Sequence, residues 1–402
     1  MTAALPDPLP EPMLDIELPL TDRRAGKVRV SYALPGERRV FVTTDRLSAF
    51  DRIIAGVPYK GQVLNQLSWW WFEHTRDIVA NHALSTPDPN VLIAAAATPL
   101  TVEVIVRGYI TGVTDTALWT RYAAGERTIY GHRFPDGLRK NTPLAEPIVT
   151  PTTKGTDGAH DMPLSCGEVV ADGHVPAELW ARVEAAAIEL FRRGSDRGLH
   201  AGLVLADTKF EFGVDAHGDL LLIDEVLTPD SSRWWVEATY DERVAAGDEP
   251  ESLDKEVVRR ALAAEGYTGE GPVPDLPPEV WVATTKRYID AFERLTGVTF
   301  TPGLYPAPSR INAALAGLDI DRHGYSDRLH RRARRPRRRH PEGRMWGAGA
   351  VDTTRRRGRP TGVLRAVRPP APWSGGCGHR GQRRQARPGP QGSGPGRQRV
   401  HP

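Results

Sequence analysis

The chain has few cysteines and no long apolar run, and each absence removes a class of protein. Only Cys166 and Cys377 occur among the 402 residues, too few for a disulfide framework or a cysteine-based zinc site. No run of about eighteen apolar residues appears, so a membrane span is not expected. The start is acidic and rich in proline, unlike a secretory signal. A cytoplasmic location is the simplest expectation.

Charge is divided unevenly along the chain. From Arg328 onward there are 21 arginines, no lysine and two acids, Glu342 and Asp352. The rest of the chain, 1–327, then holds 32 basic and 48 acidic residues, a net charge near −16. An acidic body and a strongly basic tail therefore need separate explanations.

The basic tail, placed at 303–402, lacks periodic apolar residues and is expected to be disordered. Arg, Pro, Gly and Ala are encoded by GC-rich codons, so a shifted reading frame in a GC-rich gene would produce this composition. The alternative is an evolved tail that neutralises nucleic-acid phosphates. Because lysine and interleaved aromatic residues are lacking, nucleic-acid binding is the less favoured interpretation.

The body divides into a strand-rich part and a part in which helices dominate. Alternating residues at 28–34 and 38–44 flank a Pro-Gly turn and predict a hairpin, and 61–76 has helical length. Further helices are predicted at 176–194, 254–266 and 278–296. The expected organisation is an acidic leader (1–22), a β-rich lobe (23–113), a second lobe (114–302) and the tail (303–402).

The segment from Asp207 to Val214 carries the most informative pattern. Along a strand, Asp207, Lys209 and Glu211 share one face. Phe210, Phe212 and Val214 take the other face, which can be the buried one. If the following turn centres on Ala216-His217, Lys209 lies opposite Asp224, with Glu211 one diagonal step away. Two converging carboxylates suit Mg²⁺ together with substrate phosphates. An exposed strand face with cross-strand ion pairs is the alternative.

Basic residues elsewhere offer weaker signals. Arg233 follows the second carboxylate strand, and its planar guanidinium suits carboxylate or phosphate recognition. Lys27 and Arg29 follow Gly26 on a strand and could approach ATP phosphates, although the P-loop pattern GxxxxGK[ST] is absent. The lone His160 is more simply a structural histidine than a base.

Taken together and in this order, these segments resemble the family of phosphoribosylaminoimidazole-succinocarboxamide synthase, or SAICAR synthetase. The resemblance covers about 23–300, and the joint occurrence of its motifs is specific. The matching stretches are GKVRVSY, TTDRLSAFDRIIAGVPYKGQVLNQLSWWWFE, VEVIVRGYITG, GHRFPDGLRKNTPLAEPIVTPTTKG, GAHD, LADTKFEFGVD, LIDEVLTPDSSRWW, SLDKEVVRR and TTKRYIDAFERLTG.

The resemblance implies an α+β fold of two lobes, an antiparallel-sheet N-lobe and a mixed α/β C-lobe, with the ATP site between them. It implies an ATP- and Mg²⁺-dependent ligase of purine synthesis that joins L-aspartate to 5-aminoimidazole-4-carboxylate ribonucleotide through an acyl phosphate. Another carboxylate–amine ligase or a small-molecule kinase remains the alternative enzyme. A membrane partner is not expected, and the oligomeric state stays open.

The resemblance also implies roles for individual residues. Lys27, Arg29 and Lys154 would lie on the nucleotide, with Glu211 and Asp224 as magnesium ligands. Arg107, Lys209 and Arg233 would bind the phosphate and carboxylate of the ribonucleotide, and Lys209 and Arg233 are also the catalytic candidates. The pocket around the ribonucleotide would be lined by Ser48, Asp51, Lys60 and Asp161.

Two positions depart from the family pattern. Val113 replaces the serine usual after RGYITG, and Met162 replaces the acid usual after the His-Asp pair. Valine cannot supply the hydrogen bond that a hydroxyl would give to the substrate phosphate. We therefore expect weaker binding of the ribonucleotide rather than a different reaction.

Overall fold

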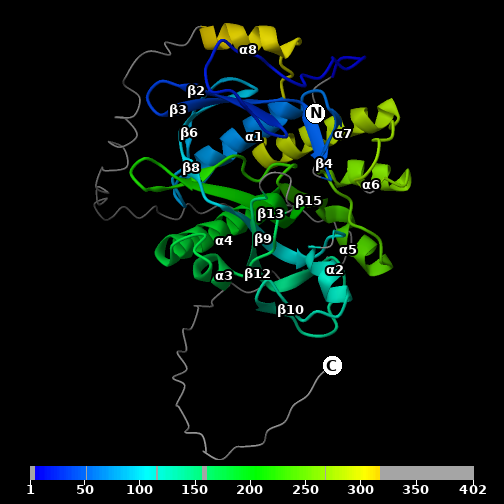
Figure 1. Cartoon of the computed structure of the whole chain (residues 1–402). Helices are drawn as coiled ribbons and strands as arrows, with labels where there is room; N and C mark the ends of the chain where they lie inside the picture. The colour runs from blue at the N-terminus through cyan, green and yellow to red at the C-terminus, as the bar shows by residue number, and fades with distance from the viewer. Residues whose placement is uncertain (1–4, 51, 115, 156–160, 268, 317–402) are drawn as a thin grey trace, which may run out of the picture. The chain divides into compact units, whose positions relative to one another are not determined.

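The computed structural model describes residues 5–50, 52–114, 116–155, 161–267 and 269–316, which Figure 1 draws in colour. These residues form two lobes, each built on an antiparallel sheet, so the expected α+β fold is confirmed. Among the helices of these ranges, none combines the length and the hydrophobicity that a membrane-spanning helix needs. The predictions for the tail beyond 316 lie outside the described residues.

The N-terminal lobe contains a five-stranded sheet in the order β1-β2-β3-β7-β6. The predicted hairpin is confirmed, because Arg29 pairs with Thr43 and Leu34 pairs with Arg38 across β2 and β3. A separate hairpin, β4–β5, follows this sheet's first strands. The strands are β1 (Arg24–Ala25), β2 (Arg29–Leu34), β3 (Arg38–Thr43), β4 (Arg46–Ala49), β5 (Arg52–Gly56), β6 (Ala83–Asp88) and β7 (Val91–Ala95).

Helices cover both faces of this sheet. Phe41 and Leu92 face α1 (Lys60–His74), whereas Val40 and Val42 face α8 (Ala307–Ala316). Apolar residues on both faces of these strands therefore follow from burial on both sides. The expectation of a structureless tail from 303 is wrong for α8, because its apolar residues, among them Ile311, complete this core.

The second lobe contains a six-stranded sheet in which β13 is the central strand. Strand β9 lies between β12 and β13, although the sequence placed it with the N-terminal lobe. A boundary at 113 is therefore too late, because β9 finds its partners far along the chain. The strands are β8 (Thr98–Pro99), β9 (Val102–Ile110), β12 (Thr142–Thr153), β13 (Leu203–Val214), β14 (Leu220–Ile223) and β15 (Ser232–Val236).

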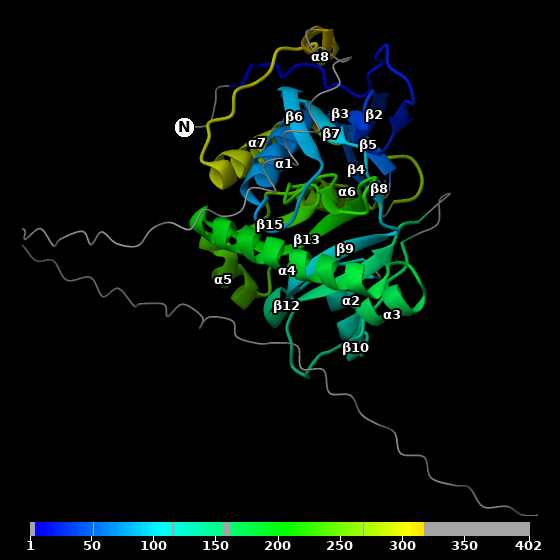
Figure 2. The same cartoon turned by 90° about the vertical axis from the view of Figure 1, so that its left-hand side faces the viewer.

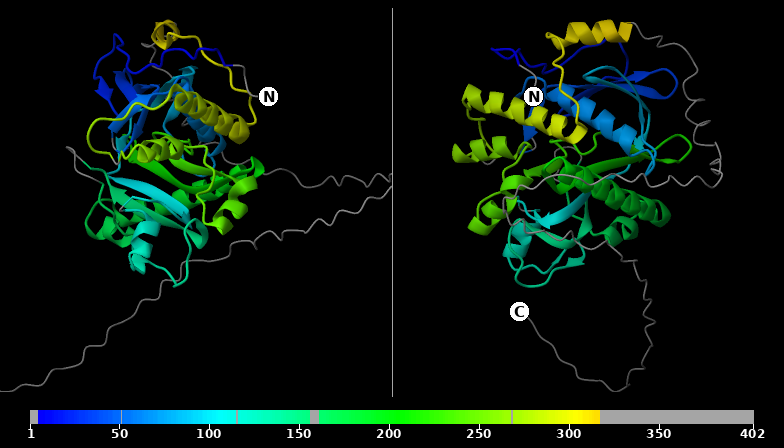
Figure 3. Two further views of the ribbon diagram at one scale, coloured as in Figure 1. Left: turned by 90° about the vertical axis from the view of Figure 1, so that its right-hand side faces the viewer. Right: turned by 180° about the vertical axis from the view of Figure 1, so that it is seen from behind.

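Helix α4 (Ala177–His200) covers one face of the second sheet and leaves the other face for the site (Figure 2). Val104, Val106 and Phe210 share its apolar core with Leu190. Figure 3 shows α6 and α7 packed beside each other, near the predicted ranges. The other elements are α2 (Leu118–Ala123), β10 (Thr128–Ile129), β11 (His132–Arg133), α3 (Cys166–Ala171), α5 (Glu237–Ala246), α6 (Glu256–Ala264) and α7 (Pro278–Thr296).

Two irregularities in β13 and β14 set the geometry of the site. On β15, Trp234 pairs with Leu205 and the preceding residue, Arg233, pairs with Asp207, so β13 carries a bulge. Because a bulge reverses the alternation that follows it, Asp207 and the residues two and four positions later face away from α4.

The assumed pairing of Lys209 with Asp224 is wrong by one residue. Glu211 pairs with Ile223 and Val214 pairs with Leu220, so the turn centres on His217. Asp224 follows the end of β14 and has a φ of 67°, a left-handed conformation that aspartate tolerates better than most residues. This conformation ends the strand and turns the chain at Asp224.

Candidate functional site

A polar cleft of about 580 Å³ opens on the face of the second sheet that α4 leaves uncovered. The glycine-containing segment between β1 and β2, the tip of the β4–β5 hairpin, β9, β13, the segment after β14 and the start of α6 all contribute to it. Its lining residues are Gly26, Lys27, Val28, Arg29, Ser48, Ala49, Phe50, Glu103, Asp161, Asp207, Lys209, Glu211, Asp224, Glu225, Pro229–Arg233, Asp254, Lys255, Glu256 and Arg259.

Glu211 lies at the centre of a network of opposite charges. Lys154 Nζ lies 2.6 Å from one carboxylate oxygen, and Lys209 Nζ lies 3.1 Å from the other. Lys209 also lies 2.6 Å from Glu103 on the neighbouring strand β9. Burial opposes ionisation of Glu211, but the two lysines outweigh burial and lower the pKa of its carboxyl group. Glu211 is therefore ionised at neutral pH.

Asp224 forms an ion pair with Arg29, which reaches it from the N-terminal lobe. A second guanidinium nitrogen of Arg29 lies 3.2 Å from Glu225. Burial would lower the pKa of Arg29, but the charges of Asp224 and Glu225 raise it instead. One arginine of β2 thus holds the two carboxylates that follow β14.

Asp207 brings two arginines together across three strands. It pairs with Arg107 of β9 on one side and with Arg233 of β15 on the other. The Nη1 atoms of these arginines lie 3.3 and 3.2 Å from the same carboxylate oxygen, respectively. Arg107 Nε also donates to Thr150 at 2.9 Å. Two fixed guanidinium groups so close together suit an anion with several oxygens, such as a phosphate.

Most of the residues that the sequence indicated lie in or beside the cleft. Lys27, Arg29, Ser48, Asp161, Lys209, Glu211, Asp224 and Arg233 line it. Lys154 and Arg107 reach it through their ion pairs with Glu211 and Asp207. Asp51 and His160 lie outside the described residues.

Lys60 differs from the other candidates, because its side chain is fully buried and does not line the cleft. Its ammonium group lies 2.7 Å from Asp230 and 2.9 Å from the carbonyl oxygen of Arg46. Tyr288 donates to the other oxygen of Asp230 at 2.6 Å. Lys60 therefore contacts the cleft residue Asp230 from the protein interior and does not line the cleft itself.

Several charged residues of the cleft were not among the sequence candidates, including Glu103, Lys255 and Arg259. Glu103 shares a face with Arg107 in the alternating strand, so period-two spacing could have found it. Lys255 and Arg259 lie at the start of α6, one turn apart. Their segment was among the matching stretches, but its local pattern is that of an ordinary amphipathic helix.

Two carboxylates facing one cleft fit a divalent cation that also binds phosphate oxygens. Both Glu211 and Asp224 act electrostatically on the Lys209 ammonium group and raise its pKa, against the effect of burial. Among the described residues, no group of three or more His, Cys, Asp or Glu side chains could enclose a metal ion. This donor set suits Mg²⁺ held jointly by protein and substrate, rather than a closed structural site.

Comparison with known sequences matches most of the body of the chain to a single protein family. A family model described as SAICAR synthetase matches residues 22–274. Phosphoribosylaminoimidazole-succinocarboxamide synthase of Legionella pneumophila (strain Lens) is 47% identical over 302 residues, covering 75% of this chain and 96% of that protein. The chloroplastic enzyme of that name from Arabidopsis thaliana is 44% identical over 296 residues, covering 73% and 71%.

The fold is also similar to that of a solved structure. SAICAR-synthase from Saccharomyces cerevisiae, complexed with SAICAR, superposes with a TM-score of 0.62 and 33% sequence identity. The similarity covers 72% of this chain and 99% of the yeast chain. The sequence and structure comparisons therefore point to the same family.

Proposed function

Because the chain belongs to the SAICAR synthetase family, we propose that its cleft joins L-aspartate to 5-aminoimidazole-4-carboxylate ribonucleotide. ATP supplies the energy, and the products are SAICAR, ADP and phosphate. The observation that carries this proposal is the meeting of Glu211, Asp224 and Lys209 with two paired arginines in one cleft. A cytoplasmic location is part of the same proposal.

The reaction needs an activated carboxylate, because oxide is a poor leaving group. The γ-phosphoryl group of ATP moves to an oxygen of the imidazole carboxylate, and ADP leaves. The uncharged amine of aspartate then attacks the carbonyl carbon, the C–O bond to phosphate breaks, and the amine loses a proton. Such chemistry asks the protein mainly for positioning and charge neutralisation, so no covalent enzyme intermediate is required.

We assign the nucleotide to the cleft wall that carries Lys27 and Arg29, with Lys154 reaching it from the position directly after β12. Glu211 and Asp224 would hold Mg²⁺, which offsets charge on the phosphate oxygens when bound. The charge of Arg29 is then shared between the nucleotide and Asp224.

Arg107 and Arg233 are assigned to the phosphate of the ribonucleotide, because Asp207 fixes both guanidinium groups. Lys209 lies between Glu103 and Glu211 and would stabilise charge on the reacting carboxylate. Ser48 and Asp161 line the same cleft and are assigned to its pocket wall. The body of the chain is acidic, so this concentration of cations is what favours anionic substrates here.

Lys255 and Arg259 are assigned to the carboxylates of aspartate. Lys255 is half-buried in the cleft, and its ammonium group makes no ion pair or hydrogen bond with another described residue. Burial lowers the pKa of its ammonium group, although the negative charge of Asp230 acts in the opposite direction and favours the protonated form. An ammonium group without a close counter-ion in a cleft favours an anionic ligand.

The test is an ADP-release assay on the purified full chain, with one substrate omitted at a time. ADP release should require MgATP, aspartate and the ribonucleotide together. Release without aspartate, giving a stable phosphorylated product, would instead identify a small-molecule kinase. Release that is unaffected by omitting the ribonucleotide would overturn the proposal.

A further inference from the structure

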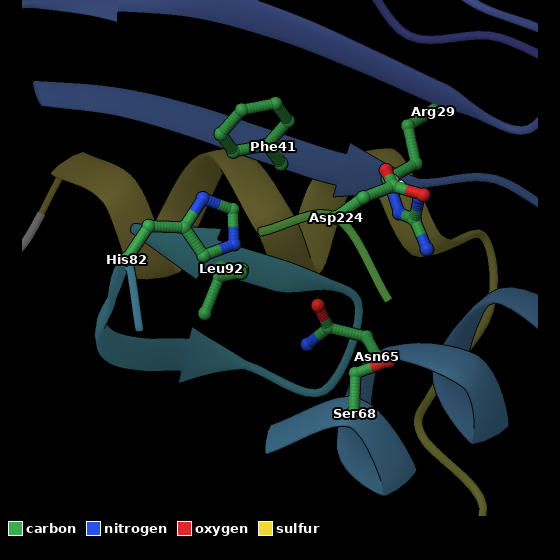
Figure 4. A pocket seen from close by; sticks show the side chains of 7 residues that line it. All are labelled: Arg29, Phe41, Asn65, Ser68, His82, Leu92 and Asp224. Carbon is green, nitrogen blue, oxygen red and sulfur yellow. Dashed lines mark hydrogen bonds and ion pairs between the residues drawn. The ribbon is translucent and has the colours of Figure 1, made fainter. Parts of the chain in front are cut away.

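A second, much smaller cavity lies beside the cleft. Its volume is about 10 Å³, and its polar lining includes Arg29, Asn65, Ser68, His82 and Asp224 (Figure 4). Arg29 and Asp224 also line the cleft, so their ion pair stands between the two spaces. The cavity is therefore placed to influence the carboxylate of Asp224 from the side opposite to the substrates.

His82 is the unusual member of this cavity. Its residue is 4% exposed, and its Nε2 atom has no hydrogen-bond partner among the described residues. The ring packs against Phe41 and Phe72, with centroid distances of 5.7 and 5.3 Å. A buried polar nitrogen without a partner is costly in a protein interior. The unpartnered nitrogen of His82 therefore needs an explanation.

The cavity has the size and chemistry to hold one water molecule. About 10–15 Å³ of this kind of space is enough for one water, provided that two to four polar groups surround it. Figure 4 shows the His82 ring turned toward the middle of the cavity, with Asn65 and Ser68 below it and the Arg29–Asp224 pair beyond. These groups include both hydrogen-bond donors and acceptors.

We propose that a buried water molecule occupies this cavity and links His82 Nε2 to the carboxylate of Asp224. His82 is then a positioning residue: it orients Asp224, and through it the Arg29 guanidinium, for the magnesium nucleotide. The inference rests on the proposed role of Asp224 at that nucleotide. The ring needs no change of protonation, because burial, followed by the charge of Arg29, lowers the pKa of His82 to about 3.

The direct test is a high-resolution crystal structure of the unaltered chain with MgADP. An ordered water within about 2.7–3.2 Å of both His82 Nε2 and an Asp224 oxygen is expected. A dry cavity, or a water that contacts neither residue, would overturn the proposal. This result does not depend on ligase activity, so failure of the proposed reaction would be seen separately.

Two substitutions separate positioning from packing. His82→Phe removes the nitrogen and keeps an aromatic ring, so calorimetric affinity for MgADP should fall about tenfold, with the KM values for aspartate and ribonucleotide unchanged. His82→Gln keeps a polar group near the cavity and should recover part of that affinity. Leu92→Val is the matched control, because it alters the apolar lining only. A lowered melting temperature with unchanged MgADP affinity in His82→Phe would contradict the proposal.

Discussion

Lys60 and Asp230 form an ion pair in the interior of the protein, with 2.7 Å between Nζ and Oδ2. The side chains are 0% and 3% exposed, so neither charge is solvated by bulk water. Lys60 begins α1, and Asp230 lines the cleft. The pair thus connects the helix of the N-terminal lobe to the site.

Lys60→Met should destabilise the protein strongly, because it leaves the Asp230 carboxylate buried without its cation. Breaking a buried pair in this way costs about 3–5 kcal/mol, measurable as the free energy of unfolding in urea. The double variant Lys60→Met/Asp230→Asn should recover part of the loss. If Lys60→Met raised a substrate KM and left stability unchanged, Lys60 would instead be a pocket residue.

The same pair predicts a dependence of stability on pH. Burial would raise the pKa of Asp230, but Lys60, then Lys255, outweigh burial and lower it to about 2. The ordinary value in an unfolded chain is about 3.9. A lowered pKa stabilises the fold above about pH 4, and this contribution is lost as pH falls toward 2. In Lys60→Met, the free energy of unfolding should therefore change less with pH between about pH 4 and pH 2 than in the unaltered chain. Equal slopes for the two proteins would contradict this prediction.

Ile311→Ala should lower the free energy of unfolding by about 2–5 kcal/mol, because Ile311 is fully buried against the N-terminal sheet. Asn312→Ala, at the exposed next position, is the matched control and should change it by less than about 0.5 kcal/mol. Equal effects would mean that α8 does not belong to the core.

Val113→Ser should lower the KM for the ribonucleotide by about tenfold or more, because a hydroxyl restores one charge-assisted hydrogen bond. Val113 is 63% exposed, so the change should leave the melting temperature as it is. An unchanged KM would show that this position does not contact the phosphate.

Lys255→Met should raise the KM for aspartate by about tenfold or more, with little change in the KM for MgATP. Lys286→Met removes the same charge from an exposed position of α7 and should affect neither constant. A rise in the ribonucleotide KM instead of the aspartate KM would reassign Lys255 to the other substrate.

Local periodicity predicted much of the fold and the central part of the site. The hairpin of β2 and β3, the helices α1, α4 and α7, and the shared face of Lys209 and Glu211 all follow from the spacing of apolar residues. These features depend on neighbours within a few positions, so the sequence carries them directly.

Long-range pairing could not be predicted in this way. The sequence of β9 has the alternating pattern of an ordinary half-buried strand. No feature of the neighbouring residues indicates that Arg107 will lie opposite Asp207, one hundred positions away. The bulge before Asp207 and the left-handed Asp224 likewise depend on tertiary partners. The burial of Lys60 could not be predicted for a similar reason, because a buried lysine needs a carboxylate from another part of the chain.

Glu211 and Asp224 are proposed to hold together the metal of a bound nucleotide. A crystal of the full chain with Mn²⁺ and a non-hydrolysable ATP analogue tests this role, since Mn²⁺ is identified by anomalous scattering. We expect one metal peak about 2.1 Å from an oxygen of each carboxylate, with the triphosphate beside Lys27 and Arg29. A metal peak elsewhere, or a triphosphate bound away from these two carboxylates, would contradict it.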